Sequence, residues 1–372
     1  MSLSWRRRLP LSPAPGGERD EVWEVSEDGG PAVELPVRVR IGKPFDVVAL
    51  KGLDPEGHRA EAERARADAA ALYGDDEAEP LRECPCCGAP AEGAPEAAVI
   101  NGVAYHRCPG CGHGYVRRRP DRAALARHHS DDEGLAGAYT DPAVVDARLA
   151  QVVMPKLDWA GGVHVAERGR EPRTALDIGA GGGHFVLGAR RGGLDAEGIE
   201  VSGPAVRFAR EALGVALRQG DALTMQPEPG SADLVTLWGV LEYAPDPFEL
   251  LRAAARWLTA DTGLLVVEVP RLDAISSAVQ REMPEEVFRH LEPASHLNAF
   301  SDASLATLLW RAGLKPVAAW YFGMDAYELL SQLAVRLGAP AMEELAEPIL
   351  GLQADLDAAL AVDDLVVAAV PR

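Results

Sequence analysis

The sequence of 372 residues predicts an α/β fold with a mostly parallel sheet, and three observations support this prediction. Apolar runs alternate with helix-forming runs from about residue 174 onward, as in successive strand–helix–strand units. A glycine-rich turn, Gly179-Ala-Gly-Gly-Gly183, follows the first apolar run, and Glu200 and Asp221 follow the next two. Open α/β sheets bind ligands at the carboxyl ends of their strands, so these residues predict a binding site there.

The glycine turn separates a buried strand ending at Ile178 from a helix over 185–191. Glycines permit positive φ and let backbone N–H groups approach a ligand. A dinucleotide fingerprint starting at Gly179 requires Gly or Ala where this chain has His184. The pattern present, D-x-G-x-G-x-G from Asp177, resembles motif I of class I S-adenosylmethionine-dependent methyltransferases. A nicotinamide-dependent enzyme and a connector without a ligand are the alternatives.

This resemblance implies a Rossmann-like sheet of seven strands in the order 3-2-1-4-5-7-6, with the last strand antiparallel. The domain is expected over 171–372, with a helical insertion at about 325–360. After the first strand, the sequence predicts strands at 194–201, 215–219, 232–238, 263–269, 314–322 and 364–370.

The same resemblance implies how S-adenosylmethionine is held. Glu200 follows Asp177 at about the spacing at which an acidic residue accepts hydrogen bonds from ribose hydroxyls in dinucleotide folds, and a solvent-facing glutamate is the alternative. Asp221 is expected to meet the adenine amino group, with the next backbone N–H, of Ala222, at a ring nitrogen. The full set of expected cofactor residues is Asp177, Gly179, Ala180, Gly181, Gly183, Glu200, Val201, Asp221, Ala222, Trp238 and Gly239.

Methyl transfer from a sulfonium requires the protein to align acceptor, methyl group and sulfur and to exclude water. An alcohol or a carbon acid also needs a general base that titrates near the working pH. His296 is the first candidate, because histidine titrates in that range. It begins His296-Leu-Asn-Ala-Phe-Ser301, which resembles a stretch in zinc-ribbon methyltransferases of bacterial biosynthetic clusters; a structural histidine is the alternative.

Glu242 and Tyr243, beyond the fourth strand, are the next candidates for the general base. They belong to Val240-Leu-Glu-Tyr-Ala-Pro-Asp-Pro247, which resembles the family's motif after that strand. Tyr243 stands where the family frequently has a histidine, so a mechanism that uses a histidine at this position as base does not carry over to this chain.

All five cysteines lie between residues 84 and 111. Cys84 and Cys87 form one C-x-x-C pair, and Cys108 and Cys111 form another, which predicts a structural zinc ribbon over 81–120. Four thiolates would leave the zinc no open position for chemistry. Cys86 is then a spectator, while His106 and His113 are possible substitute ligands and a redox pair is the alternative.

Residues 1–80 are expected to form an N-terminal extension of unknown role, with 1–20 disordered. Short strands are predicted within 22–41, followed by a helix that Asp54 caps. Residues 121–170 are expected to form a helical linker or lid, in which Tyr139 is a candidate lid residue.

The net charge of −20 argues against a nucleic-acid substrate, although 115–119 is a local basic run. No apolar run is long enough to cross a bilayer, and no secretion signal follows Arg6–Arg8, so we expect a cytoplasmic protein. The favoured function is C- or O-methylation of a small molecule, a sugar nucleotide or a natural-product intermediate. The alternatives are an RNA methyltransferase that reads RNA with its ribbon and a non-catalytic module that binds S-adenosylmethionine. A homodimer is possible.

Overall fold

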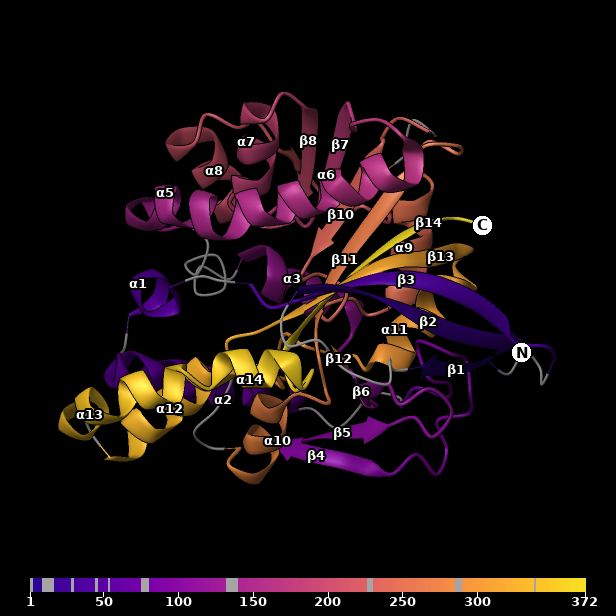
Figure 1. The fold of residues 1–372 in the computed structure, drawn as a ribbon. Helices are drawn as coiled ribbons and strands as arrows, with labels where there is room; N and C mark the ends of the chain where they lie inside the picture. The colour runs from indigo at the N-terminus through magenta and orange to yellow at the C-terminus, as the bar shows by residue number, and fades with distance from the viewer. Residues whose placement is uncertain are drawn as a thin grey trace.

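The fold is a long central sheet with helices on both faces and a second, small sheet at one end of the molecule (Figure 1). It is taken from a computed structural model. The structure describes residues 3–8, 17–27, 30–43, 46–52, 54–74, 80–131, 140–225, 230–284, 290–337 and 339–372.

Seven strands of the central sheet have the predicted order. They are β7 (Thr174–Ile178), β8 (Asp195–Glu200), β9 (Arg218–Gln219), β10 (Leu234–Trp238), β11 (Leu264–Pro270), β13 (Leu314–Phe322) and β14 (Asp364–Pro371). Their arrangement, β9-β8-β7-β10-β11-β14-β13, is the order 3-2-1-4-5-7-6, and β14 runs antiparallel to both neighbours. The predicted fold class is confirmed, although β9 forms only two of the five residues expected at 215–219.

Helices cover both faces because strand residues alternate between two apolar clusters. On one face Ala175 of β7 packs in a cluster with Trp159 and Phe185. On the other face Leu176 packs in a cluster with Leu251. The helices that flank the seven strands are α6 (Met154–Arg168), α7 (His184–Arg191), α8 (Gly203–Ala212), α9 (Pro247–Ala255) and α11 (Asp302–Arg311).

Side chains set the starts of several helices. Ser202 caps α8, and Ser301 forms a capping box with Ser304 at α11. Both caps lie at the starts that the sequence predicts. The helix expected at 143–160 is divided into η1 (Pro142–Val144), α5 (Val145–Arg148), a π-helical segment η2 (Leu149–Val153) and α6. Tyr139 lies outside the described residues.

The N-terminal extension lengthens the central sheet to ten strands. Its strands are β1 (Leu3–Arg8), β2 (Gly17–Glu27) and β3 (Val33–Ile41), and β3 pairs in parallel with β13. The expectation of disorder over 1–20 is therefore wrong for β1 and for the start of β2, because pairing satisfies their backbone groups. Residues 1–2 and 9–16 of that range lie outside the described residues. The extension continues with α1 (Val47–Lys51) and α2 (Pro55–Tyr73), and Asp54 caps α2 as predicted.

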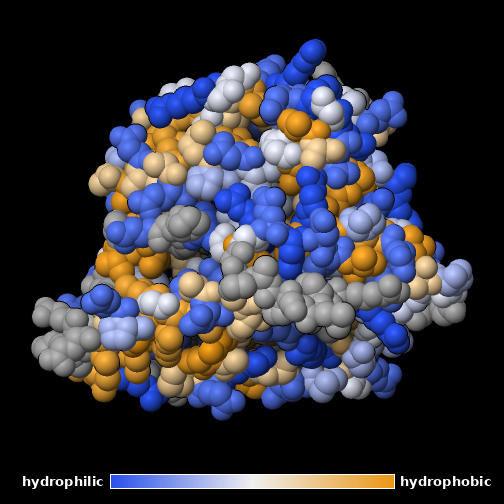
Figure 2. Space-filling model, in the orientation of Figure 1, coloured by the Kyte–Doolittle hydropathy of each residue, from blue (hydrophilic) through white to orange (hydrophobic). Residues whose placement is uncertain are grey.

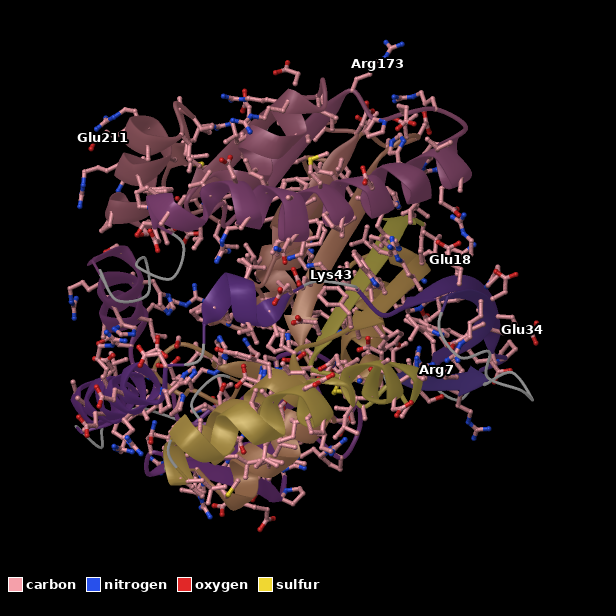
Figure 3. All side chains as sticks on the ribbon, turned by 60° about the vertical axis from the view of Figure 1, so that its left-hand side comes forward. Arg7, Glu18, Glu34, Lys43, Arg173 and Glu211 are labelled. Atoms are coloured by element: carbon pink, nitrogen blue, oxygen red, sulfur yellow. The ribbon has the colours of Figure 1, made fainter. Side chains whose placement is uncertain are left out.

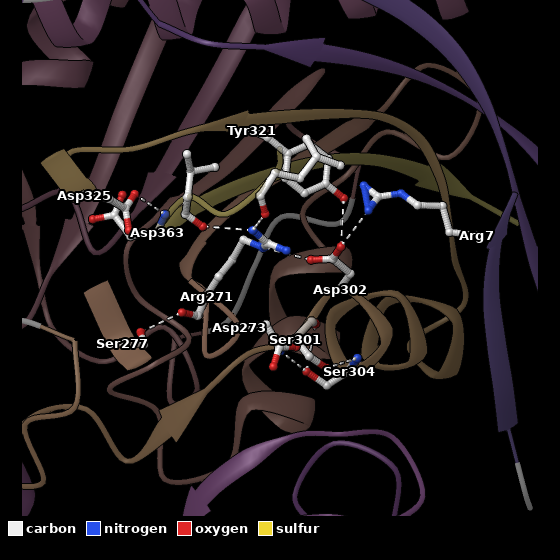
Figure 4. Close-up of polar contacts among 12 residues, drawn as sticks. Arg7, Arg271, Asp273, Ser277, Ser301, Asp302, Ser304, Tyr321, Asp325 and Asp363 are labelled. Carbon is white, nitrogen blue, oxygen red and sulfur yellow. Dashed lines mark hydrogen bonds and ion pairs between the residues drawn. The ribbon is translucent and has the colours of Figure 1, made fainter. Parts of the chain in front are cut away.

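A buried polar network ties the extension to the sheet (Figure 4). Asp302, the first residue of α11, accepts hydrogen bonds from Arg7 of β1 at 3.0 Å and from Arg271 at 2.9 Å. Arg7 also pairs with Glu21 of β2 at 2.7 Å. The Tyr321 hydroxyl lies 3.3 Å from Asp302, and burial raises its pKa above the ordinary range. The strands β1, β2 and β3 of the extension are thus part of the central sheet and are held to it by buried side chains.

The small sheet contains β4 (Glu96–Ile100), β5 (Val103–Arg107), β6 (Gly114–Val116) and β12 (Asn298–Ala299), in the order β12-β6-β5-β4. It lies at the opposite end of the molecule from α7 and α8 (Figure 1). Three of its strands belong to the cysteine-rich segment, and α3 (Arg122–Asp131) follows them. The fourth strand, β12, comes from the predicted His296 stretch.

The C-terminal insertion is helical, as predicted, with α12 (Asp325–Leu337), α13 (Ala339–Leu350) and α14 (Gln353–Ala358); α10 (Ile275–Glu282) packs against α12. Figure 2 shows hydrophobic residues gathered on the surface over α12 and α14. Leu337, the last residue of α12, and Leu352, directly before α14, are exposed.

The homodimer stays a prediction. Among the described residues no helix combines the length and the apolar character that a bilayer span requires.

Candidate functional site

The glycine turn connects β7 to α7 with a backbone that other residues rarely adopt. Gly179, Gly181 and Gly183 have φ values of +73°, +51° and +79°. A Cβ at Gly179 would lie 2.6 Å from a methyl carbon of Val240, so the turn could not accept a side chain there without moving. The N–H groups of Gly179 and Ala180 donate to the Ile199 carbonyl at 2.9 and 3.0 Å, which anchors the turn on β8.

Glu200 stands at the end of β8 beside this turn, and its carboxylate is held from two sides. Oε2 accepts a hydrogen bond from the Gly181 N–H at 2.7 Å, and Oε1 accepts one from the Ser202 N–H at 2.7 Å. Each carboxylate oxygen has a further lone pair, so the fixed carboxylate can also accept hydrogen bonds from two ligand hydroxyls. The buried position of Glu200 disfavours the alternative of a solvent-facing glutamate.

Asp177 and Asp221 have different surroundings. Asp177 is buried and accepts a hydrogen bond at 2.7 Å from Thr236, so it links β7 to β10. Burial raises the pKa of Asp177 to about 7. Asp221 is exposed, and its Oδ1 accepts the Leu223 N–H at 2.8 Å in the turn after β9. The next residue, Ala222, is buried.

A buried ion pair at the ends of β10 and β11 was not predicted from the sequence. Lys156 of α6 donates to Glu268, the third residue from the end of β11. Its Nζ lies 4.7 Å from the ring centroid of Trp238, which packs on Phe185 at 5.3 Å. Trp238 was expected at the cofactor. Lys156 was not predicted, because no sequence pattern links this part of α6 to the sheet edge.

Lys43 is a second buried lysine near this edge, and it lies two residues after the end of β3 in the extension. Its Nζ lies 4.7 Å from the ring centroid of Phe322, and Figure 3 shows it near the centre of the molecule, whereas Glu34 and Glu211 lie at the periphery. Burial, together with the charge of the nearby Lys156, lowers the pKa of Lys43 to about 8.

The structure brings two of the three predicted catalytic candidates, Tyr243 and His296, into contact. The rings of Tyr243 and His296 meet edge to face with centroids 4.9 Å apart. Glu242 directly precedes Tyr243 and is buried. His129 of α3, which the sequence analysis missed, meets Tyr243 at 5.7 Å. The C-terminal ends of β10 and α3 and the segment before β12 therefore converge on one aromatic cluster.

The surroundings of His296 select one tautomer. Its Nδ1 lies 3.0 Å from the carbonyl oxygen of His290, and only an Nδ1–H can donate to that oxygen. The acceptor lone pair of a neutral ring is then on Nε2, which can take up a proton. The Nε2 of His290 lies 3.0 Å from the Asp363 carboxylate. The Asp363 N–H donates at 2.9 Å to the carboxylate of Asp325 (Figure 4). Burial raises the pKa of Asp325 to about 8.

The loops that carry Tyr243 and His296 are joined by Asn298. Its Nδ2 donates to the carbonyls of Leu241 and Ala244 at 3.0 and 2.7 Å. Its Oδ1 accepts a hydrogen bond from Arg119 at 2.8 Å. Arg119 belongs to the basic run that could have suggested RNA binding, but it is buried.

The four predicted cysteine ligands converge. The sulfurs of Cys84, Cys87, Cys108 and Cys111 all lie within 4.8 Å of one another. Cys84 and Cys111 are 3.8 Å apart at sulfur, and Cys87 and Cys108 are 3.5 Å apart. A tetrahedron with Zn–S bonds of about 2.3 Å has sulfurs roughly 3.8 Å apart, so the set fits a zinc ion. Cys86, His106 and His113 lie outside this group.

Comparisons with known proteins give the class of the central domain. Residues 156–319 match a family profile described as a methyltransferase domain. Three curated relatives, from Methylococcus capsulatus, Ralstonia nicotianae and Cupriavidus pinatubonensis, are each named ubiquinone biosynthesis O-methyltransferase. They are 39%, 34% and 35% identical over 23%, 32% and 32% of this chain. The matches span 38%, 52% and 49% of those relatives, so about half of their length or less.

Similar solved structures include an S-adenosylmethionine-dependent methyltransferase from Archaeoglobus fulgidus, with 17% identity and a TM-score of 0.41 over 67% of this chain and 99% of that one. A geranyl diphosphate C-methyltransferase from Streptomyces coelicolor has 16% identity and a TM-score of 0.41 over 62% of this chain and 83% of that one. The family match and the sheet order confirm that the chain contains an S-adenosylmethionine-dependent methyltransferase domain.

Glu242 gives this site a testable pH dependence. Burial raises its pKa to about 8, and its Oε2 has no hydrogen-bond partner among the described residues. The folded protein therefore holds a proton that the unfolded chain releases near pH 4, so this group makes stability fall as pH rises from about 5 to 8.

We expect Glu242→Gln to remove that dependence. The difference in unfolding free energy between variant and wild type should grow in favour of the variant as pH rises, by at most about 1.4 kcal/mol per pH unit. Denaturant titrations at pH 5, 6, 7 and 8 measure it, with Glu249→Gln on the exposed side of α9 as the matched control. A constant difference for Glu242→Gln would contradict the assignment.

Proposed function

We propose that this protein is an S-adenosylmethionine-dependent O-methyltransferase of a small molecule. The single observation that carries the proposal is the pairing of the glycine turn with the fixed carboxylate of Glu200 at the carboxyl edge of the sheet. The name of the curated relatives supports oxygen as the methylated atom. C-methylation is the alternative that the reaction products distinguish.

In this proposal the turn and the strand ends bind the cofactor, which supplies an activated methyl group on sulfur. Glu200 accepts hydrogen bonds from the two ribose hydroxyls. The Asp221 carboxylate and the Ala222 N–H face the adenine. The backbone of Gly179–Gly183 follows the cofactor closely because no Cβ intervenes. Val201, Trp238 and Gly239 complete the pocket.

The aromatic cluster is proposed as the acceptor side. His296 Nε2 accepts the proton of the acceptor hydroxyl, while the Nδ1–H bond to the His290 carbonyl keeps the ring oriented. Tyr243 packs edge to face against that ring and bounds the acceptor. Lys156, paired with Glu268 beside Trp238, lies where the cofactor and acceptor sides meet.

We also propose that the four cysteines hold a structural zinc ion. Four thiolate ligands would close the coordination sphere, so the metal would stabilise the fold and take no part in the transfer. Metal analysis of the purified protein should give one zinc per chain. Cys111→Ser should lower this content, whereas Cys86→Ser should leave it unchanged; equal loss in both variants would contradict the ligand set.

The proposed activity is tested by incubating the protein with S-adenosylmethionine and a panel of phenols, catechols and sugar nucleotides. We expect formation of S-adenosylhomocysteine together with a methyl ether of one acceptor. Methyl transfer to bulk RNA, with salt-sensitive micromolar binding, would instead support the alternative function, that of an RNA methyltransferase. Absence of cofactor binding would contradict the proposal. A cytoplasmic location stays a prediction.

A further inference from the structure

The cysteine-rich sheet does not end within its own segment. Strand β6, the last of the three strands from the cysteine-rich segment, pairs with β12, so that Tyr115 faces Asn298 and Gly114 faces Ala299. The Val116 N–H donates to the Leu297 carbonyl at 3.0 Å. Leu297, Asn298 and Ala299, which make these contacts, directly follow His296 in the chain. The residues that follow the proposed base therefore form the fourth strand of the ribbon sheet.

Side chains of the ribbon reach the same segment. The Tyr105 hydroxyl, on the central strand β5, donates to the backbone carbonyl of His296 at 2.6 Å. Arg119 donates to the Leu297 carbonyl at 3.2 Å. The Ser301 hydroxyl donates at 3.2 Å to the carbonyl of Cys111, one of the four metal ligands. Tyr105 and Arg119 are buried, so water does not compete for their hydrogen bonds.

We propose that the zinc ribbon positions the base, so that metal binding at the four cysteines is a condition for the active placement of His296. Tyr105 and Arg119 are positioning residues that act through the His296 segment. This inference rests on the proposed function of His296. It gives the ribbon a scaffold role in place of the RNA-reading role considered as an alternative.

The physical basis is the dependence of a small metal site on its ion. Cys84 and Cys111 come from the two separate turns of the ribbon, and a metal bound by the four cysteines would join those turns. In small sites of this kind, the free energy of metal binding is also folding free energy. Loss of the metal would therefore loosen β5 and β6, which hold the His296 segment.

The cofactor side is built independently of the ribbon. Glu200 accepts hydrogen bonds from the N–H groups of Gly181 and Ser202. The N–H groups of the glycine turn donate to the Ile199 carbonyl of β8. Metal loss should therefore separate two properties. Cofactor binding should persist, while the placement of His296 should be lost.

Two tyrosines provide a matched pair of variants. Tyr105 and Tyr115 are both fully buried in the ribbon sheet. The hydroxyl of Tyr105 holds the His296 carbonyl, whereas the hydroxyl of Tyr115 has no hydrogen-bond partner among the described residues. Tyr105→Phe removes one hydrogen bond to the His296 segment and leaves the metal ligands intact. Tyr115→Phe removes a hydroxyl of the same kind without that bond.

The experiment measures hydrogen exchange of peptides spanning 294–300 and the His296 tautomer by nitrogen NMR of histidine-labelled protein, with His296→Asn to assign the signal. We expect exchange at 294–300 to rise at least tenfold after chelation of zinc and at least threefold in Tyr105→Phe, and the fixed Nδ1–H tautomer to give way to exchange between forms. Tyr115→Phe should match the wild type. Peptides of β7 and β8 should keep their protection, and S-adenosylhomocysteine affinity should stay within threefold.

Unchanged exchange at 294–300 and an unchanged tautomer, after zinc removal and in Tyr105→Phe, would overturn the inference. Equal effects of Tyr105→Phe and Tyr115→Phe would overturn the assigned role of Tyr105. Failure of the zinc-loaded wild type to bind S-adenosylhomocysteine would instead overturn the proposed function, so the two failures are distinguishable. If an acceptor is found, Tyr105→Phe should lower kcat and leave the KM for S-adenosylmethionine unchanged.

Discussion

Replacement of Glu200 by alanine should weaken S-adenosylhomocysteine binding about 100-fold or more. Two hydrogen bonds from the ribose hydroxyls to a charged acceptor are lost, each worth about 1.5–3 kcal/mol. The Gly181 and Ser202 N–H groups also lose the acceptor that orders the turn. Equilibrium dialysis with labelled S-adenosylhomocysteine measures the change, and circular dichroism confirms that the variant is folded.

Glu197→Ala is the matched control for this prediction. Glu197 lies on the same strand, β8, but is exposed and contacts Arg218 at 3.4 Å. Its removal should change the affinity less than twofold. Similar losses in the two variants would point to a general effect on the strand, and normal affinity in Glu200→Ala would remove Glu200 from the cofactor site.

Replacement of His296 by asparagine should lower kcat by a factor of about 100 to 10,000, the usual contribution of a positioned general base. Asparagine keeps a polar side chain but cannot take up a proton near neutral pH. Because Glu200 and the glycine turn are untouched, S-adenosylhomocysteine affinity should stay within twofold of the wild type. Initial rates of S-adenosylhomocysteine formation with the acceptor found by screening provide the measurement.

The pH profile separates a base from a structural histidine. For the wild type, log kcat should rise with slope one below the pKa of His296 and then level off, because the neutral ring is the active form. In His296→Asn the residual rate should lose that slope. A variant with near-normal kcat and the wild-type profile would end the assignment of His296 as base.

The catalytic sheet was predictable because its signals are local. Strands β7, β10 and β11 are short, largely apolar runs, and the three positive-φ glycines occupy positions where a side chain would be strained. The caps at Asp54, Ser202 and Ser301 are likewise set by neighbouring residues.

The N-terminal extension shows where local signals end. Its hairpin strands β2 and β3 could be recognised, but the parallel pairing of β3 with β13 joins residues 38–41 to residues 318–321. Nothing in either segment specifies the other, because backbone pairing carries little sequence information and the choice of partner depends on packing. The ion pair of Arg7 with Asp302 likewise joins two distant segments of the chain, and neither segment specifies the other.

The site was predictable to the extent that motifs mark it. Glu200 ends a predicted strand, Tyr243 and His296 each lie in a recognisable stretch, and the structure places the last two in contact. Lys156 and His129 lie on helices before the first catalytic strand and carry no motif. The pairing of β12 with β6 was also beyond the sequence, although a histidine stretch and a cysteine pair were each recognised separately.

The most direct test of this account is a crystal structure of the zinc-loaded protein with S-adenosylhomocysteine. We predict both ribose hydroxyls on Glu200, the adenine beside Asp221 and the sulfur facing Tyr243 and His296. A ligand bound elsewhere, or one whose ribose does not touch Glu200, would contradict the proposed cofactor site and with it the assigned acceptor side.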